Sequence, residues 1–186
     1  MEYNKESDLN KNDKMTLIAL FTGILSALKH ISTNKAIRYI QCLPLICRLH
    51  YNSIENRKIR SINKNKYHPI KPQRGEIYNA YITEGVGSEL CNNHLVLIIQ
   101  NKKGNIYGEK VNVLPIEGDG NRINPHYHVK LTNAHLESGH LDKDPSRIII
   151  TDITTLDKAR LDRKIGKINT NCLAQVENLL RKQLEL

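Results

Sequence analysis

The sequence predicts a mainly β domain of the α+β class, a small β-barrel with a C-terminal helix, preceded by an N-terminal helical extension. Short apolar segments separated by turn residues recur after Pro72, and apolar residues with helical spacing lie before Pro44 and after Thr170. Repeated short strands are typical of barrels or sandwiches and not of a parallel α/β sheet. With no Trp and one Phe, the core of this 186-residue chain must come mainly from Ile, Leu and Val, which suits a modest barrel.

The first part of the chain is expected to form a helical extension over residues 1–50. Residues 1–14 are polar and carry no periodicity, which predicts a mobile terminus or a lead-in to a helix. The apolar residues that follow are spaced alternately by four and three, as on one face of a helix: Leu17, Phe21, Ile24, Leu28 and Ile31. We expect this face to pack on a neighbour or on a dimer mate.

A second helix and a linker are expected before the barrel. Thr33 or Asn34 can cap a helix that continues to about residue 40, and Pro44 would end it or begin another. Residues 51–72 hold few large apolar side chains, many Asn, Lys and Arg, and two closing prolines that disfavour a helix. We therefore predict a basic linker over residues 51–72.

The barrel domain is predicted over residues 73–186. Alternating or continuous apolar segments indicate strands at residues 76–82, 95–99, 110–116, 127–131 and 147–153. The continuous segment LVLII is expected to be a central strand buried on both faces. After a Thr/Asn start signal, one helical face carries Leu173, Val176, Leu180 and Leu184, which predicts a helix that docks on the barrel.

Positive charge is concentrated before the barrel. The formal charge is +9, and residues 1–73 hold 13 Lys and Arg against 5 Asp and Glu, whereas residues 74–186 hold 15 against 14. Basic segments attract phosphate backbones or anionic surfaces without base specificity. The densest part, with Arg57, Lys58 and Arg60, is a candidate RNA contact; the alternative is a solvated tether.

The sequence also indicates a cytoplasmic protein. Its four cysteines form neither a CxxC pair nor a disulfide-type pattern, and no secretory signal opens the chain. The uncharged stretch at residues 15–28 is 14 residues long, while a membrane-spanning helix needs about 20 apolar residues. No membrane span or membrane partner is therefore expected.

Several segments, taken in order, resemble the MazF/PemK toxin family. They are QRGEIYNAYITEGVGSE, LVLIIQN, VNVLPI, HVKL and TTLDKARLDRKIGKI, within residues 73–186. The resemblance implies an SH3-like barrel of the type shared by CcdB and MazF, which forms a homodimer and is silenced by a cognate antitoxin peptide. It also implies cleavage of single-stranded RNA (mRNA) by transesterification through the ribose 2′-hydroxyl, without a metal or another cofactor.

The resemblance assigns three catalytic positions. Family members carry an arginine followed by proline at the start of the second strand, where this chain has His94 and Leu95. The family position after the third strand holds a small hydroxyl or acidic residue, and here it is Glu117, while Ser88 matches the loop serine. A carboxylate and an imidazolium form a complete acid/base couple for this reaction.

The remaining expected RNA contacts come from the matched motifs and from the basic segment. They are Arg74, Gly87, Glu89, Gln100, Asn101 and His128, together with Arg57, Lys58 and Arg60. Glycines in the loop that contains Gly87 would let it fold over a ligand, whereas a plain turn is the alternative.

Two other functions are open from the sequence alone. A guanidinium carries a permanent charge and an imidazole does not, so with His94 the chain could be a binding module for RNA, an antitoxin or another protein that has lost cleavage. Zinc is conceivable at His126, His128, His135 and His140, although no Cys, Asp or Glu stands beside them at ligand spacing.

Overall fold

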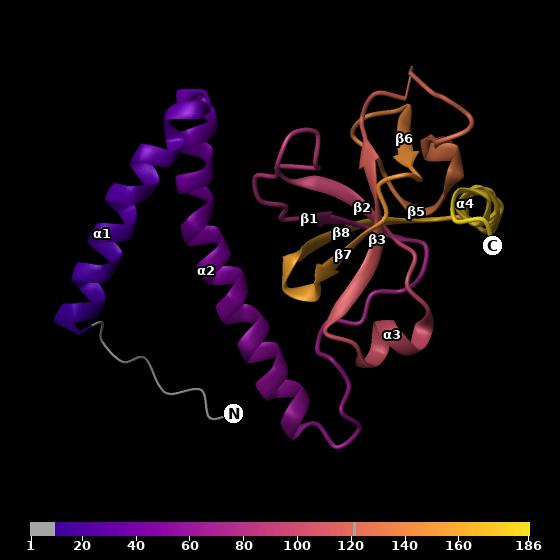
Figure 1. The fold of residues 1–186 in the computed structure, drawn as a ribbon. Helices are drawn as coiled ribbons and strands as arrows, with labels where there is room; N and C mark the ends of the chain where they lie inside the picture. The colour runs from indigo at the N-terminus through magenta and orange to yellow at the C-terminus, as the bar shows by residue number, and fades with distance from the viewer. Residues whose placement is uncertain (1–9, 121) are drawn as a thin grey trace. The chain divides into compact units, whose positions relative to one another are not determined.

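The computed structural model describes residues 10–120 and 122–186 (Figure 1). The expectation of a mobile terminus falls largely on residues 1–9, which lie outside the described residues. The chain divides into two compact units, one ending at Leu43 and the other running from Pro44 to Leu186. Each unit is described by itself.

The predicted first helix is present as α1 (Lys11–Ala27). Asn10 caps it and Asp13 closes a capping box, so the helix begins inside the segment expected to be a lead-in. A short 3₁₀ turn, η1 (Leu28–His30), follows. The apolar side chains of α1 are exposed, with Phe21 at 46% and Ile24 at 39%, and their packing on a dimer mate stays a prediction.

Helix α2 (Thr33–Ile62) is longer than expected and corrects the predicted linker. The Ser32 hydroxyl, and not Thr33 or Asn34, accepts the N–H of Lys35 at its start. The helix passes through Pro44 and continues to Ile62, so residues 51–62 are helical. The helix is held there by distant partners: Ser53 donates to Asp157 (2.8 Å).

The second unit contains an eight-stranded, antiparallel curled sheet, as the α+β barrel prediction required. The order of its main path is β4-β6-β3-β2-β1-β8-β5, and β7 pairs with β3. The strands are β1 (Glu76–Ala80), β2 (His94–Ile98), β3 (Lys110–Glu117), β4 (His128–Leu131), β5 (Leu136–Gly139), β6 (Ser146–Ile149), β7 (Thr154–Asp157) and β8 (Leu161–Ile168). The five predicted strands are present, although the strand expected over residues 147–153 ends at Ile149.

Short helices complete this unit. They are α3 (Lys102–Tyr107), two 3₁₀ turns, η2 (Asn133–His135) and η3 (Lys158–Arg160), and α4 (Thr170–Gln183). Helix α4 is the predicted docking helix, and the Asn169 side chain accepts the N–H of Cys172 at its start (2.9 Å). Helix α3 was not predicted; the Asn101 side chain caps it by accepting the N–H of Gly104.

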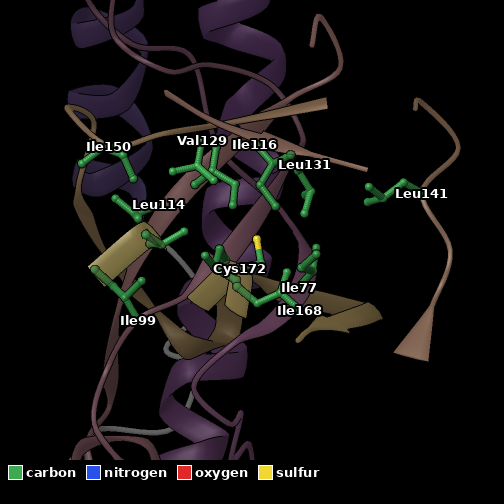
Figure 2. Close-up of a cluster of buried hydrophobic side chains, with 13 residues drawn as sticks. Ile77, Ile99, Leu114, Ile116, Val129, Leu131, Leu141, Ile150, Ile168 and Cys172 are labelled. Atoms are coloured by element: carbon green, nitrogen blue, oxygen red, sulfur yellow. The ribbon is translucent and has the colours of Figure 1, made fainter. Parts of the chain in front are cut away.

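Two apolar clusters cover the two faces of the sheet. In the larger one, Cys172 of α4 packs with side chains such as Ile77 and Ile168 (Figure 2), and Val176 of the same helix and Leu97 belong to this cluster too. The smaller cluster contains the intervening residues of β2, Val96 and Ile98, together with residues of β1, β3, β7 and β8. Val96, Leu97 and Ile98 are all fully buried, which confirms that this strand is buried on both faces.

A buried polar cluster connects the second half of α2 to the sheet. His68 is 1% exposed, and its Nε2 lies 3.5 Å from Glu109, which also pairs with Arg60 (2.5 Å). Lys158 is fully buried and donates to the carbonyl of Asn105 (2.6 Å). Burial lowers the pKa of Lys158 to about 8 and also lowers the pKa of His68.

The lowered pKa of His68 predicts a loss of stability in acid. Below the ordinary pKa of 6.5, the unfolded chain binds a proton at His68 more readily than the folded chain does. The free energy of unfolding should therefore fall as pH drops from 7.5 to 5.5, and less steeply in His68→Gln, as measured by urea unfolding. His50→Gln, at an exposed position of α2, is the control. Equal slopes for the parent and His68→Gln would contradict this assignment.

Candidate active site

His94 and Glu117 lie next to each other at the ends of two neighbouring strands. His94 begins β2 and Glu117 ends β3, one position beyond the pair Leu95 and Ile116. Directly opposed residues share a sheet face, with Cβ atoms about 4.5–5.5 Å apart. Both line a cavity of about 470 Å³, together with residues that include Gly118, Asp142, Lys143 and Ser146. The structure thus brings together two of the three residues expected to be catalytic.

Arg147 is a neighbour of this pair that the sequence motifs did not indicate. It lies opposite Glu117 across β3 and β6. Its Nε donates to Oε2 of Glu117 (3.0 Å), its Nη2 donates to the same oxygen, and its Nη1 donates to the carbonyl of Arg122 (2.5 Å). Oε1 of Glu117 has no hydrogen-bond partner among the described residues. The sequence shows Arg147 as a charged residue directly before three isoleucines, residues 148–150. Which residue it pairs with depends on the strand register.

The imidazole of His94 is partly exposed and makes one long hydrogen-bond contact. Its Nδ1 lies 3.4 Å from the carbonyl of Asn92, a residue with a φ of 66° in the turn before β2. Nε2 has no hydrogen-bond partner in the described part of the chain. The ring is therefore accessible from the cavity, and one nitrogen is available to a ligand.

Ser88, the third residue expected to be catalytic, does not line this cavity. It lines a different cavity of about 570 Å³, together with Glu89 and residues of the β6–β7 connection. Gly87 has a φ of +58°, which favours glycine, and Glu89 closes the loop by accepting the N–H of Val86 (2.8 Å). The loop between β1 and β2 carries these residues toward β7 and not toward His94. Motif order does not determine the direction of a long loop.

Arg74, Gln100 and Asn101 are also separated from the His94 cavity. Arg74 lines a third cavity of about 620 Å³, donates to Glu177 of α4 (2.9 Å) and binds the carbonyl of Ile99. Asn101 caps α3, and the carbonyl of Gln100 accepts from Asn105 (3.0 Å). Gln100 and Asn101 follow the C-terminal end of β2, where Arg74 binds the carbonyl of Ile99, whereas His94 is at the N-terminal end of β2. Their expected contact with RNA gains no support from this arrangement.

The remaining candidates lie on other elements. His128 begins β4, and its Nδ1 accepts the N–H of Asn124 (3.1 Å). On α2, Arg60 is paired with Glu109, and a hydrogen bond to Glu55 raises the pKa of Lys58. Arg57 is exposed on the same helix. Arg60 therefore connects α2 to the sheet.

Neither a metal centre nor a membrane-spanning helix is found among the described residues. Within residues 10–120 and 122–186, no group of three or more His, Cys, Asp and Glu side chains is placed to hold a metal ion, so the zinc alternative at the four histidines gains no support. Nor does the described part of the chain contain a helix with the length and apolar character needed to cross a membrane.

Comparisons with known proteins point to one family. Residues 73–184 match the family described as PemK-like, MazF-like toxin of type II toxin-antitoxin system. The chain is 35% identical over 114 residues to endoribonuclease MazF of Staphylococcus saprophyticus. The aligned region covers 61% of this chain and 92% of that protein.

Two solved structures are similar to the same part of the chain. MazF from Deinococcus radiodurans has a TM-score of 0.49 at 19% identity and covers 62% of this chain and 97% of its own. A mycobacterial endoribonuclease, solved in complex with its cognate antitoxin, has a TM-score of 0.45 at 19% identity. The match covers 62% of this chain and 95% of the endoribonuclease chain.

Proposed function

Because the chain belongs to the PemK-like, MazF-like toxin family of type II toxin-antitoxin systems, we propose that it is an endoribonuclease acting on single-stranded RNA, with mRNA as its cellular substrate. The observation that carries this proposal is the position of His94 and Glu117, which line one cavity from the ends of adjacent strands. We place the reaction in the cytoplasm, where mRNA is translated.

The proposed reaction is a transesterification that needs one base and one acid. Glu117 removes the proton from the ribose 2′-hydroxyl, and the 2′-oxygen attacks the neighbouring phosphorus. The bond from phosphorus to the 5′-oxygen breaks as the His94 imidazolium donates its proton to that oxygen. The products are a 2′,3′-cyclic phosphate and a 5′-hydroxyl, so atoms and charge balance without a cofactor.

Arg147 supports this role of Glu117. It binds Oε2 through two nitrogens and is itself held by the carbonyl of Arg122, which restricts the carboxylate to one orientation. Oε1 is then the oxygen available to the 2′-hydroxyl. A base with one oxygen anchored and the other accessible loses little orientational entropy during the reaction.

One feature favours a second candidate function, a binding module without cleavage. The family arginine is replaced by His94, and an imidazole is charged only part of the time near neutral pH. Such a module would use the same cavity to hold RNA, an antitoxin or another protein. The two functions differ in whether the RNA backbone is broken.

An RNA digestion distinguishes these functions. The full chain, incubated with mixed-sequence single-stranded RNA in the presence of EDTA, should give discrete products, while single-stranded DNA of the same sequence stays intact. Glu117→Gln should reduce the rate by about 10²- to 10⁴-fold, the range for loss of a general base. If Glu117→Gln is as active as the parent, the cavity is not the site; if RNA is bound and stays intact, the chain is the binding module.

We further propose that the chain forms a homodimer and is inhibited by a cognate antitoxin peptide. The mycobacterial endoribonuclease was solved with its antitoxin. The strands at the two ends of the sheet, β4 and β5, have backbone groups that a second copy can pair with or shield.

Sedimentation of the full chain tests the homodimer. We expect a dimer at tens of micromolar, because the edge strands and the exposed face of α1 can be covered by a second copy. A concentration-independent monomer would contradict it.

A further inference from the structure

The cavity of His94 and Glu117 is also lined by a lysine, Lys143. Among the described side chains that line this cavity, it is the one with a permanent positive charge. Its ammonium takes part in no salt bridge with the described residues, whereas the guanidinium of Arg147 is paired with Glu117. The cavity also contains the carboxylate of Asp142, so the two carboxylates are offset by Lys143 and the neighbouring Arg147.

Gly118 provides the surface on which Lys143 lies. A Cβ added at Gly118 would collide with Cδ of Lys143 and would lie 3.1 Å and 3.2 Å from its Cβ and Cγ. Gly118 follows Glu117 directly, so the aliphatic part of the Lys143 side chain lies against the backbone next to the proposed base. The φ of Gly118 is not positive, so a side chain at this position would meet Lys143 and would not strain the backbone.

The backbone of Lys143 is fixed by the loop that carries it. Its carbonyl accepts from the hydroxyl of Ser146 (2.6 Å), a residue that is 2% exposed. Asp144 accepts the N–H of Asn133 (3.0 Å), and Asn133 in turn accepts the N–H of Leu141 (2.7 Å), which is 1% exposed. The loop is therefore anchored on both sides of Lys143, which fixes the point on the backbone from which its side chain extends.

We infer that Lys143 is a further catalytic residue, whose ammonium binds a non-bridging oxygen of the scissile phosphate. This inference rests on the proposed cleavage at His94 and Glu117. The phosphate gains negative charge when the 2′-oxygen attacks, and an ammonium beside it stabilises that charge more strongly than it stabilises the ground state. Lys143 thus supplies the permanent charge that His94 lacks, and the proton of the imidazolium remains available for the leaving oxygen.

Three variants of the full chain test this role, with Lys110→Gln as the matched control. Lys110 is exposed at the opposite end of β3 from Glu117. Lys143→Gln should reduce the single-turnover cleavage rate by about 10²- to 10³-fold, the range for loss of a transition-state donor, and Lys143→Arg should retain most activity. Gly118→Ala, which displaces the aliphatic chain, should also lower the rate. Lys110→Gln should stay within about threefold of the parent.

Two readouts separate this inference from the proposed function. Thermal unfolding monitors the fold of each variant, and the affinity for an RNA with 2′-deoxyribose at the cleaved position monitors binding without cleavage. Lys143→Gln should weaken this affinity more than Lys110→Gln does. If the parent binds RNA without cleaving it, a weaker affinity of Lys143→Gln alone still supports phosphate binding. Equal cleavage and affinity in Lys143→Gln and Lys110→Gln, or no binding of RNA by the parent, would overturn the inference.

Discussion

Replacing His94 with alanine is expected to reduce RNA cleavage by about 10²- to 10⁴-fold, because the leaving 5′-oxygen then lacks its proton donor. The parent should show a bell-shaped pH profile, since the carboxylate base must be ionised while the imidazolium acid keeps its proton. His94→Arg is the sharper variant. It restores the guanidinium of the family and should retain or raise activity, and its pH profile should lose the falling limb.

The outcomes of the two His94 variants are informative in combination. If His94→Ala cleaves RNA as fast as the parent, the acid lies elsewhere. If the parent is inactive and His94→Arg cleaves, the natural protein is the binding module. Initial rates on one defined RNA across a range of pH, with thermal unfolding as a check on folding, provide the measurement.

Deleting residues 1–72 is expected to lower the free energy of unfolding by several kcal/mol, whereas deleting residues 1–43 should have little effect on the second unit. The longer deletion removes Leu49, which is 6% exposed, and the partners of Asp157 and Glu109. Loss of a buried leucine costs about 2–5 kcal/mol, and the partly buried carboxylates of Asp157 and Glu109 also lose hydrogen-bond partners.

Urea unfolding of the full chain and of the two shortened chains measures this difference. The chain that begins at Pro44 retains the second half of α2 and serves as the control for removal of the first unit. Equal stability of residues 44–186 and residues 73–186 would contradict the view that this half of α2 belongs to the barrel unit.

The parts of the fold that depend on local patterns were predictable from the sequence. The run from Leu95 to Ile99 is apolar throughout because both sheet faces are covered there, and the apolar face of α4 faces the larger cluster. The end of α2 was not predictable in the same way. Residues 51–62 have weak apolar periodicity, and one of their stabilising partners, Asp157, is 104 positions away from Ser53.

The same distinction applies to the candidate site. His94 and Glu117 were predicted together because the family resemblance assigns one to the start of the second strand and the other to the end of the third. Arg147 was missed because its contact with Glu117 depends on the register between β3 and β6, which local patterns do not specify. Ser88 lines a different cavity because the long loop before β2 turns toward β7, and the direction of that loop follows from packing.

The chemistry of the product ends tests the central claim most directly. Cleavage through the 2′-hydroxyl by His94 and Glu117 predicts fragments that end in a 2′,3′-cyclic phosphate and begin with a 5′-hydroxyl, formed by the parent and almost absent with Glu117→Gln. Mass spectrometry of the fragments identifies both ends. Fragments with a 3′-hydroxyl and a 5′-phosphate, or cyclic phosphate formed equally by Glu117→Gln, would contradict the proposed mechanism.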